Sequence, residues 1–369
     1  MRISIPAAVL AGCTATLLFQ PPAVATDSSV DPAPRTSAGG GSVTSVALTS
    51  GGAVAPRATR AFDLLGVVWD GPPTALAGGS VRVRTRDAAT GRWGDWHTLE
   101  TGADGPDSAQ RGSTAPLWVG HSNGVAVDVH PGPAGLPRGL RVDLVDPGQG
   151  AAAADDQPLT EHAAGPEAPT APRPGIVTRK GWGADESIRE AGFVYTGSVR
   201  VAFVHHTATA TDYACSDAPK VIRSIYLFHV QTNKWRDIGY NFLVDRCGTI
   251  YEGRAGGVNQ PVLGAHTLGF NTNSSGIAAI GTFSEDNPPQ ELQDGIAKIA
   301  AWKLDLGGWK ADGSAQLTSG SDSSLYPKGT VVDFASISGH RDGFATECPG
   351  EALYHRLPDI RDTAGRLQR

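Results

Sequence analysis

Two patterns of apolar and polar residues divide the chain. Between residues 61 and 146, short runs of alternating apolar and polar positions are separated by Gly, Pro and Asp, and the runs show no helical period. The predicted strands are 62–69, 80–86, 115–120, 124–129 and 140–145. The region therefore predicts a small all-β domain, sandwich-like in form.

Residues 176–369 combine strand and helix periods. Apolar runs predict strands over 199–204 and 276–281, and 241–244 with 249–252 flank Cys247-Gly248 as a hairpin. Helices are predicted after Asp217, with Pro219 in the first turn, and over 292–306 and 351–367. This alternation predicts an α/β domain with a central mixed β-sheet flanked by helices, and about 190 residues suffice for a full core.

The remaining segments are poor in large apolar residues. Residues 1–25 are typical of a signal peptide, with a positive charge at Arg2, an uncharged apolar stretch and the small residues 23–25 as cleavage site. In an alternative interpretation, the lipobox-like residues 10–13 make Cys13 a lipid anchor. Residues 26–60 predict a flexible linker, and 147–175 a second, Pro/Ala-rich linker.

Charge and hydropathy exclude two classes of partner. The formal net charge of −6 over 369 residues gives no basis for binding nucleic acid. After the N-terminus no run of 18 apolar residues occurs, so we expect no membrane span. With the signal peptide, we expect a secreted, extracellular or cell-wall-associated protein, which we also expect to be a monomer. Arg82, Arg84 and Arg86 share one strand face, which is either a solvated outer face or a contact for an anionic polymer.

The cysteine count poses a question of pairing. Export implies an oxidising compartment, and cleavage after residue 25 removes Cys13 and leaves Cys215, Cys247 and Cys348. Two of the three can form a disulfide bond. The third must be free, intermolecular or bound to something else.

Histidines concentrate in the C-terminal region, and two of them occupy favourable positions. His205 follows an apolar strand, where a side chain can leave the core, and His340 follows a second β-like run eight residues before Cys348. Zinc prefers imidazole and thiolate ligands, and a catalytic zinc keeps three protein ligands. These three residues would supply that set and leave Cys215 and Cys247 to pair, although such a spacing also occurs by chance.

Other catalytic signatures are missing from the sequence. It contains no H-E-x-x-H and no G-x-S-x-G, and neither a P-loop nor a G-x-G-x-x-G stands between a strand and a helix. The zincin and α/β-hydrolase arrangements and the common nucleotide-binding sites are thereby excluded.

Longer motifs carry a family resemblance over about residues 176–369. In order, they are Trp182-Gly183-Ala184, Val204-His205-His206-Thr207-Ala208, the run from Asp237 to Val244, Gly264-Ala265-His266, the run from Gly276 to Gly281, Gly339-His340-Arg341-Asp342 and the run from Ala345 to Gly350. This series resembles the peptidoglycan recognition proteins, which are related to the type 2 N-acetylmuramoyl-L-alanine amidases. The 61–146 region resembles a β domain upstream of the amidase in some actinobacterial members.

The resemblance implies a zinc hydrolase that acts on peptidoglycan. It implies Zn²⁺ at His205, His340 and Cys348, and hydrolysis of the amide between the lactyl group of N-acetylmuramic acid and L-Ala. Tyr240 matches the active-site tyrosine, whose phenol can donate a hydrogen bond to the developing oxyanion. Thr346 either hydrogen-bonds the zinc water or the substrate, or caps the following turn.

The resemblance also suggests residues around the metal. His206 would point to the opposite strand face, as a packing residue or as a contact of the ligands. His266 and Asn271 are expected to line the groove for glycan strand and stem peptide, and Arg254 to contact a peptide carboxylate. We expect His229 to be a structural histidine.

Two rival functions remain at this stage. Family members that only bind muropeptides typically lack the cysteine ligand, so Cys348 favours an enzyme over a non-catalytic peptidoglycan-binding protein. A lysozyme-like glycosidase would need two carboxylates flanking the cleavage point, and the sequence places no such pair.

Overall fold

The computed structural model describes Met1 and residues 35–36, 40–101, 111–150 and 169–369. The expected signal peptide and Cys13 lie outside the described residues. Within the described part of the chain, no helix has both the length and the apolar character that crossing a membrane requires.

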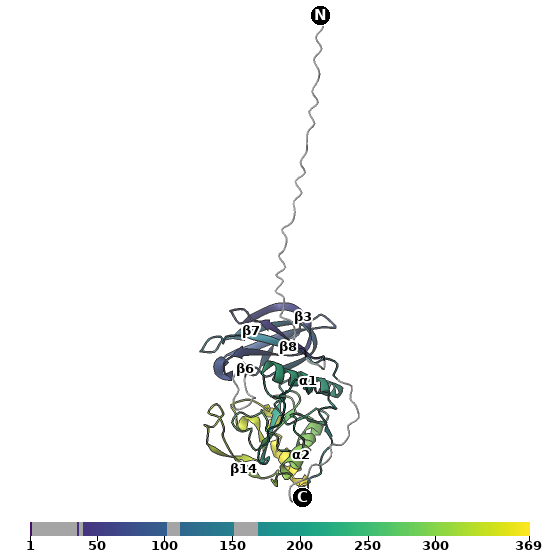
Figure 1. The fold of residues 1–369 in the computed structure, drawn as a ribbon, viewed down its shortest axis with the longest axis vertical. Helices are drawn as coiled ribbons and strands as arrows, with labels where there is room; N and C mark the ends of the chain where they lie inside the picture. The colour runs from purple at the N-terminus through teal and green to yellow at the C-terminus, as the bar shows by residue number, and fades with distance from the viewer. Residues whose placement is uncertain (2–34, 37–39, 102–110, 151–168) are drawn as a thin grey trace. The chain divides into compact units, whose positions relative to one another are not determined.

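The N-terminal β domain, as we call the described residues 35–146, is a single antiparallel sheet (Figure 1). Along the sheet its strands run β1-β2-β8-β3-β7-β4-β5, and β6 pairs with β3. They are β1 (Arg35–Thr36), β2 (Ser42–Ala47), β3 (Ala53–Asp70), β4 (Ser80–Asp87), β5 (His97–Leu99), β6 (Arg111–Ser113), β7 (Leu117–His130) and β8 (Arg141–Asp146); a 3₁₀ turn, η1 (Pro73–Leu76), follows β3. The all-β prediction is confirmed.

The flexible linker expected over 26–60 is wrong for its described second half. Residues 42–47 form β2, and β3 begins at Ala53. Both faces of this part of the sheet are covered: Val43 is buried in the apolar cluster that includes α1, whereas Val46 and Val54 are buried in a second cluster on the other face. The high content of Ser, Gly and Thr concealed these strands, because residues on both faces of β2 are buried and the sequence therefore lacks a clear period of two.

The C-terminal α/β domain, described over 169–369, is built on a six-stranded mixed sheet in the order β16-β10-β13-β11-β12-β9. Only the β11–β12 hairpin is antiparallel within this sheet. The strands are β9 (Ile176–Val177), β10 (Val201–His206), β11 (Phe242–Val244), β12 (Ile250–Glu252), β13 (Ser274–Ala279) and β16 (Ile337–Gly339), and a separate hairpin joins β14 (Ser314–Thr318) to β15 (Val331–Ala335). The predicted mixed sheet is confirmed, whereas the β14–β15 hairpin was missed.

Helices cover both faces of this sheet. The helical elements are η2 (Cys215–Asp217), α1 (Ala218–Leu227), the π-helical turn η3 (Phe228–Thr232), α2 (Gln290–Asp305), η4 (His340–Asp342), α3 (Glu351–Tyr354) and α4 (Leu357–Leu367). Apolar residues of α2 and α4 share one buried cluster with the sheet, and those of α1 share another. The helix expected over 351–367 is divided, because His355 and Arg356 separate α3 from α4 just before Pro358.

Helix α1 also packs against the β domain. Its buried residues form one apolar cluster with Leu64, Val68 and Trp118 of the β domain. Gly66 permits the close approach, since a Cβ atom there would lie 2.4 Å from the Phe228 ring. At the edge, Nζ of Lys220 donates a hydrogen bond of 2.9 Å to the buried carboxylate of Asp63. Residues Pro32–Arg369 accordingly form one compact unit.

Candidate metal centre

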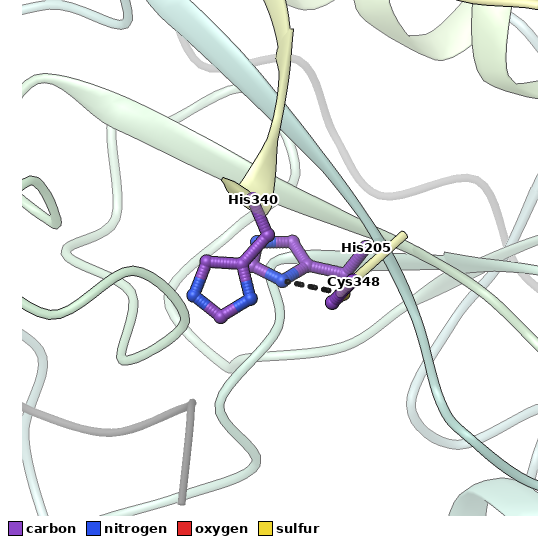
Figure 2. A group of neighbouring side chains, drawn as sticks. All are labelled: His205, His340 and Cys348. Carbon is purple, nitrogen blue, oxygen red and sulfur yellow. Dashed lines mark hydrogen bonds between the residues drawn. The ribbon is translucent and has the colours of Figure 1, made fainter. Parts of the chain in front are cut away.

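Three side chains far apart in sequence meet at one end of the mixed sheet. His205 lies near the end of β10, and His340 directly follows β16, which pairs with β10 in parallel. Cys348 comes from the loop before α3. One potential ligand atom from each residue lies within 4.8 Å of the others, and all three side chains are buried. Figure 2 shows the two imidazoles side by side, with the thiol next to His205.

The imidazole of His205 is held from its far side. Nδ1 lies 3.8 Å from Sγ of Cys348, whereas Nε2 lies 3.3 Å from Nδ1 of His266. Burial lowers the pKa of His205 to about 3, and the charge of His206 contributes. A neutral ring with one nitrogen held by a neighbour and the other directed at a thiol is the form that binds a metal ion.

His266 supports His205 rather than lining a groove, which corrects the expectation. It is fully buried, and burial with its charged neighbours lowers its pKa well below the usual value. Two glycines make room for the ring, because a Cβ atom on Gly264 or Gly276 would lie 2.4 Å from it. Asn271 is buried as well, and its Oδ1 accepts hydrogen bonds from the backbone of His266 and Thr267. Both residues thus fix the loop behind the cluster.

The donor set fits a zinc ion. Two imidazoles and one thiol are the ligands zinc prefers, and three protein ligands leave a fourth position for water. A nitrogen at about 2.1 Å and a sulfur at about 2.3 Å from one tetrahedral ion lie about 3.6 Å apart. The observed separation of 3.8 Å between His205 Nδ1 and Cys348 Sγ is close to this value.

Tyr240 lies beside the cluster. Its ring centroid is 5.4 Å from that of His205, and it lines a small cavity together with His340 and Cys348. His229 packs 5.7 Å from the Tyr240 ring, and its Nδ1 accepts a hydrogen bond of 3.1 Å from the backbone N–H of Gly239. His229 is therefore a structural histidine, as expected, and it holds the backbone that positions Tyr240.

Two other predicted site residues have structural partners. Oγ1 of Thr346 accepts a hydrogen bond of 3.2 Å from the backbone N–H of Cys348, which is the turn-capping alternative. The Arg254 guanidinium donates to the carbonyls of Ile238 and Leu263, and burial lowers its pKa to about 10 although Asp237 opposes this. Because backbone oxygens occupy these donors, the structure does not bear out a contact of Arg254 with substrate.

The arginines of β4 also have partners within the protein. Arg82 pairs with Asp128 at 2.5 Å, Arg86 donates to Asn123 at 2.9 Å, and the Arg84 guanidinium lies over Trp93. These arginine side chains interact with neighbouring residues of the β domain's own surface.

A disulfide bond joins Cys215, in η2 before α1, to Cys247, in the turn of the β11–β12 hairpin. It links the first helix to the sheet and leaves Cys348 as the third cysteine of the described chain.

The β domain reaches the same site, which sequence reasoning missed. The carboxylate of Glu100 lies 3.2 Å from Nε2 of His206, and Ser113 to Pro116 line the small cavity next to Cys348. His206 itself contacts a carboxylate at the edge of the cluster. No local sequence pattern marks Glu100, because only the packing of α1 on the β domain brings it there.

Comparison with known proteins agrees with this architecture. A family model described as N-acetylmuramoyl-L-alanine amidase matches residues 195–351. A model described as Rv3811 N-terminal galactose-binding domain-like matches residues 21–173. The chain therefore joins a galactose-binding-like all-β domain to a domain of the amidase fold.

Individual relatives name the family. Peptidoglycan-recognition protein SC1a of Drosophila melanogaster is 30% identical over 182 residues, which cover 49% of this chain and 83% of that protein. A peptidoglycan recognition protein of Trichoplusia ni is 28% identical over 187 residues, or 50% of this chain and 85% of the relative. This chain belongs to the peptidoglycan recognition protein family. Its family relation supports peptidoglycan binding or amidase activity.

A solved structure aligns over the same half of the chain. Drosophila PGRP-LB is 27% identical and covers 50% of this chain and 92% of its own, with a TM-score of 0.39. At this TM-score the alignment adds nothing to the family assignment.

Proposed function

We propose that the protein is a zinc-dependent N-acetylmuramoyl-L-alanine amidase that cleaves the amide between the lactyl group of N-acetylmuramic acid and L-Ala. The observation that carries this proposal is the buried cluster of His205, His340 and Cys348, whose ligand atoms lie within 4.8 Å of one another. A binding module needs no such donor set.

The residues around the cluster have distinct roles in this proposal. A zinc ion bound there would polarise the carbonyl and lower the pKa of a water to about 7. His266 holds His205 in its ligating orientation through the 3.3 Å contact between their rings. The phenolic O–H of Tyr240 donates a hydrogen bond to the carbonyl oxygen as negative charge develops there. His229 and Thr346 keep the backbone of Tyr240 and Cys348 in place.

We also propose that the enzyme acts outside the cell, as a monomer composed of the β domain and the α/β domain. The Cys215–Cys247 disulfide suits an oxidising compartment, and the sequence of residues 1–25 suits a cleaved signal peptide. Peptidoglycan, with its glycan strand and stem peptide, is the partner. Recovery of the protein from culture medium tests the export, and N-terminal sequencing tests the cleavage; an intact Met1 contradicts a cleaved signal peptide.

Digestion of purified peptidoglycan, with and without a chelator, tests the activity. Chelator-sensitive release of new L-Ala amino termini is the expected result. New reducing sugars would instead identify a glycosidase, and binding without release would identify a recognition module. The chelated sample should regain activity when zinc is restored.

A further inference from the structure

A groove of about 1360 Å³ adjoins the candidate metal centre, and both domains line it. Trp96, Thr98 and Glu100 contribute from the β domain, and the segment from Ala208 to Tyr213 contributes from the α/β domain. None of the three cluster residues lines the groove itself.

The groove adjoins the small cavity beside the cluster. That cavity, of about 30 Å³, is lined by Tyr240, His340 and Cys348, and it shares Glu100 and Ala115 with the groove. Its volume is about that of a water molecule in the liquid and far below that of a sugar ring. A reacting water fits inside, whereas the bulk of a substrate must be bound in the groove.

The β domain's side of the groove is fixed in place. Its sheet shares an apolar cluster with α1, and the ring of Phe228 packs directly on the backbone of Gly66. The backbone N–H of Ala115 donates a 2.8 Å hydrogen bond to the carbonyl of Glu100, which connects two of the β-domain segments that line the groove. A largely apolar interface of this kind opposes movement of one domain against the other.

Trp96 is the side chain of the groove best suited to contact a ligand. It is 41% exposed, which is unusual for so large an apolar group. The guanidinium groups of Arg82 and Arg84 lie 5.6 and 5.0 Å from its ring centroid, so the ring is held while much of its surface faces solvent. A rigid indole presents a flat apolar surface to the apolar face of a pyranose ring.

The acidic side chains that line the groove indicate which class of ligand it can bind. Asp87, Asp212 and Glu285 line it, and Lys220, the lysine of its lining, pairs with Asp63. An acidic lining disfavours a polyanion and accepts an uncharged N-acetylhexosamine chain.

We propose that this groove binds the glycan strand that carries the scissile amide, with Trp96 of the β domain as its stacking platform. The proposal rests on the amidase function proposed above and deepens it. The β domain thereby belongs to the substrate site, and glycan bound along the groove presents the lactyl amide to the cavity beside Cys348.

Trp96→Ala in the full chain tests the proposal, with Trp93→Ala as matched control, since Trp93 also lies over Arg84 but is outside the groove lining. The probe is an uncharged oligosaccharide of N-acetylglucosamine, titrated calorimetrically, because a peptide-free N-acetylmuramic acid would carry a free lactyl carboxylate that the acidic lining disfavours. Trp96→Ala should weaken binding about tenfold, whereas Trp93→Ala should match the wild type. Trp96→Phe, which retains a ring, should recover most of the affinity and so exclude misfolding as the cause.

Kinetics separate this proposal from the proposed function. On intact peptidoglycan Trp96→Ala should raise KM about tenfold with little change in kcat, and on N-acetylmuramoyl-dipeptide both constants should stay unchanged. If both tryptophan variants cleave peptidoglycan with the wild-type KM and kcat, the proposed glycan groove is wrong and the proposed amidase function is unaffected. Trp96-dependent oligosaccharide binding without release of L-Ala amino termini supports the groove and overturns the amidase.

Discussion

The carboxylate of Glu100 lies 3.2 Å from Nε2 of His206, although 106 residues separate them along the chain. Burial raises the pKa of Glu100, yet the hydrogen bond and charge of His206, with the charge of Arg341, lower it overall. The β domain therefore places the carboxylate of Glu100 against His206, the residue that follows the proposed zinc ligand His205 in the sequence. The β domain and the α/β domain thus meet at the candidate metal site itself.

Cys348→Ser should abolish zinc binding and activity together. A serine hydroxyl does not ionise as a thiol does, so the third ligand is lost. Elemental analysis of the purified variant measures the metal, and the peptidoglycan digest measures activity. Glu347→Gln is the matched control, because that neighbouring side chain is 85% exposed and should leave both unchanged. Stoichiometric zinc in the serine variant would remove Cys348 from the ligand set.

Tyr240→Phe should keep zinc and lose turnover. The ring that packs against His205 and His229 remains, and only the hydroxyl is removed. Loss of one oxyanion donor lowers kcat by roughly 10²–10³-fold. Steady-state kinetics with metal analysis on the same sample check this. A variant with wild-type kcat would exclude Tyr240 from oxyanion stabilisation.

The sequence was most informative where chemistry and periodicity coincide. The alternation of strands and helices predicted the mixed sheet, and the positions of His205 and His340 after two strands selected side chains that the structure brings together with Cys348. Those signals are local, because strand ends and helix starts depend on neighbouring residues. His205 itself was expected to leave the core but is fully buried. Cys348 was singled out by counting cysteines.

Predictions failed where a residue's role depends on contacts between distant segments. His266, Asn271 and Arg254 were expected to face substrate, but the structure buries the first two and bonds the third to backbone carbonyls. These polar side chains form hydrogen bonds with the loops around them. Such contacts between distant segments leave no local sequence pattern. Glu100 went unnoticed for the same reason, since only the packing of α1 on β3 brings it to His206.

Gly276→Ala should impair the metal site without touching a ligand. The added Cβ would lie 2.4 Å from Cγ of His266, which in turn contacts His205. Overpacking of this kind costs about 1–3 kcal/mol, and disturbing a ligand's supporting residue typically weakens metal binding about 10–100-fold. Thermal denaturation and competition with a zinc chelator measure the two effects. Gly175→Ala, with nothing within 4 Å of the new atom, is the control; equal zinc affinity in both variants contradicts the prediction.

His229→Gln should flatten the acid side of the stability profile. Burial lowers the pKa of His229 to about 3, with a contribution from Arg254, whereas an unfolded histidine titrates near 6.5. Between these values the unfolded state binds one more proton, so stability present above pH 6.5 is lost as pH falls towards 3. Glutamine does not titrate and can still accept the hydrogen bond from Gly239. Between about pH 4 and 6, urea denaturation should show a slope shallower by up to about 1.4 kcal/mol per pH unit, and parallel profiles would show that His229 does not stay neutral in the folded protein.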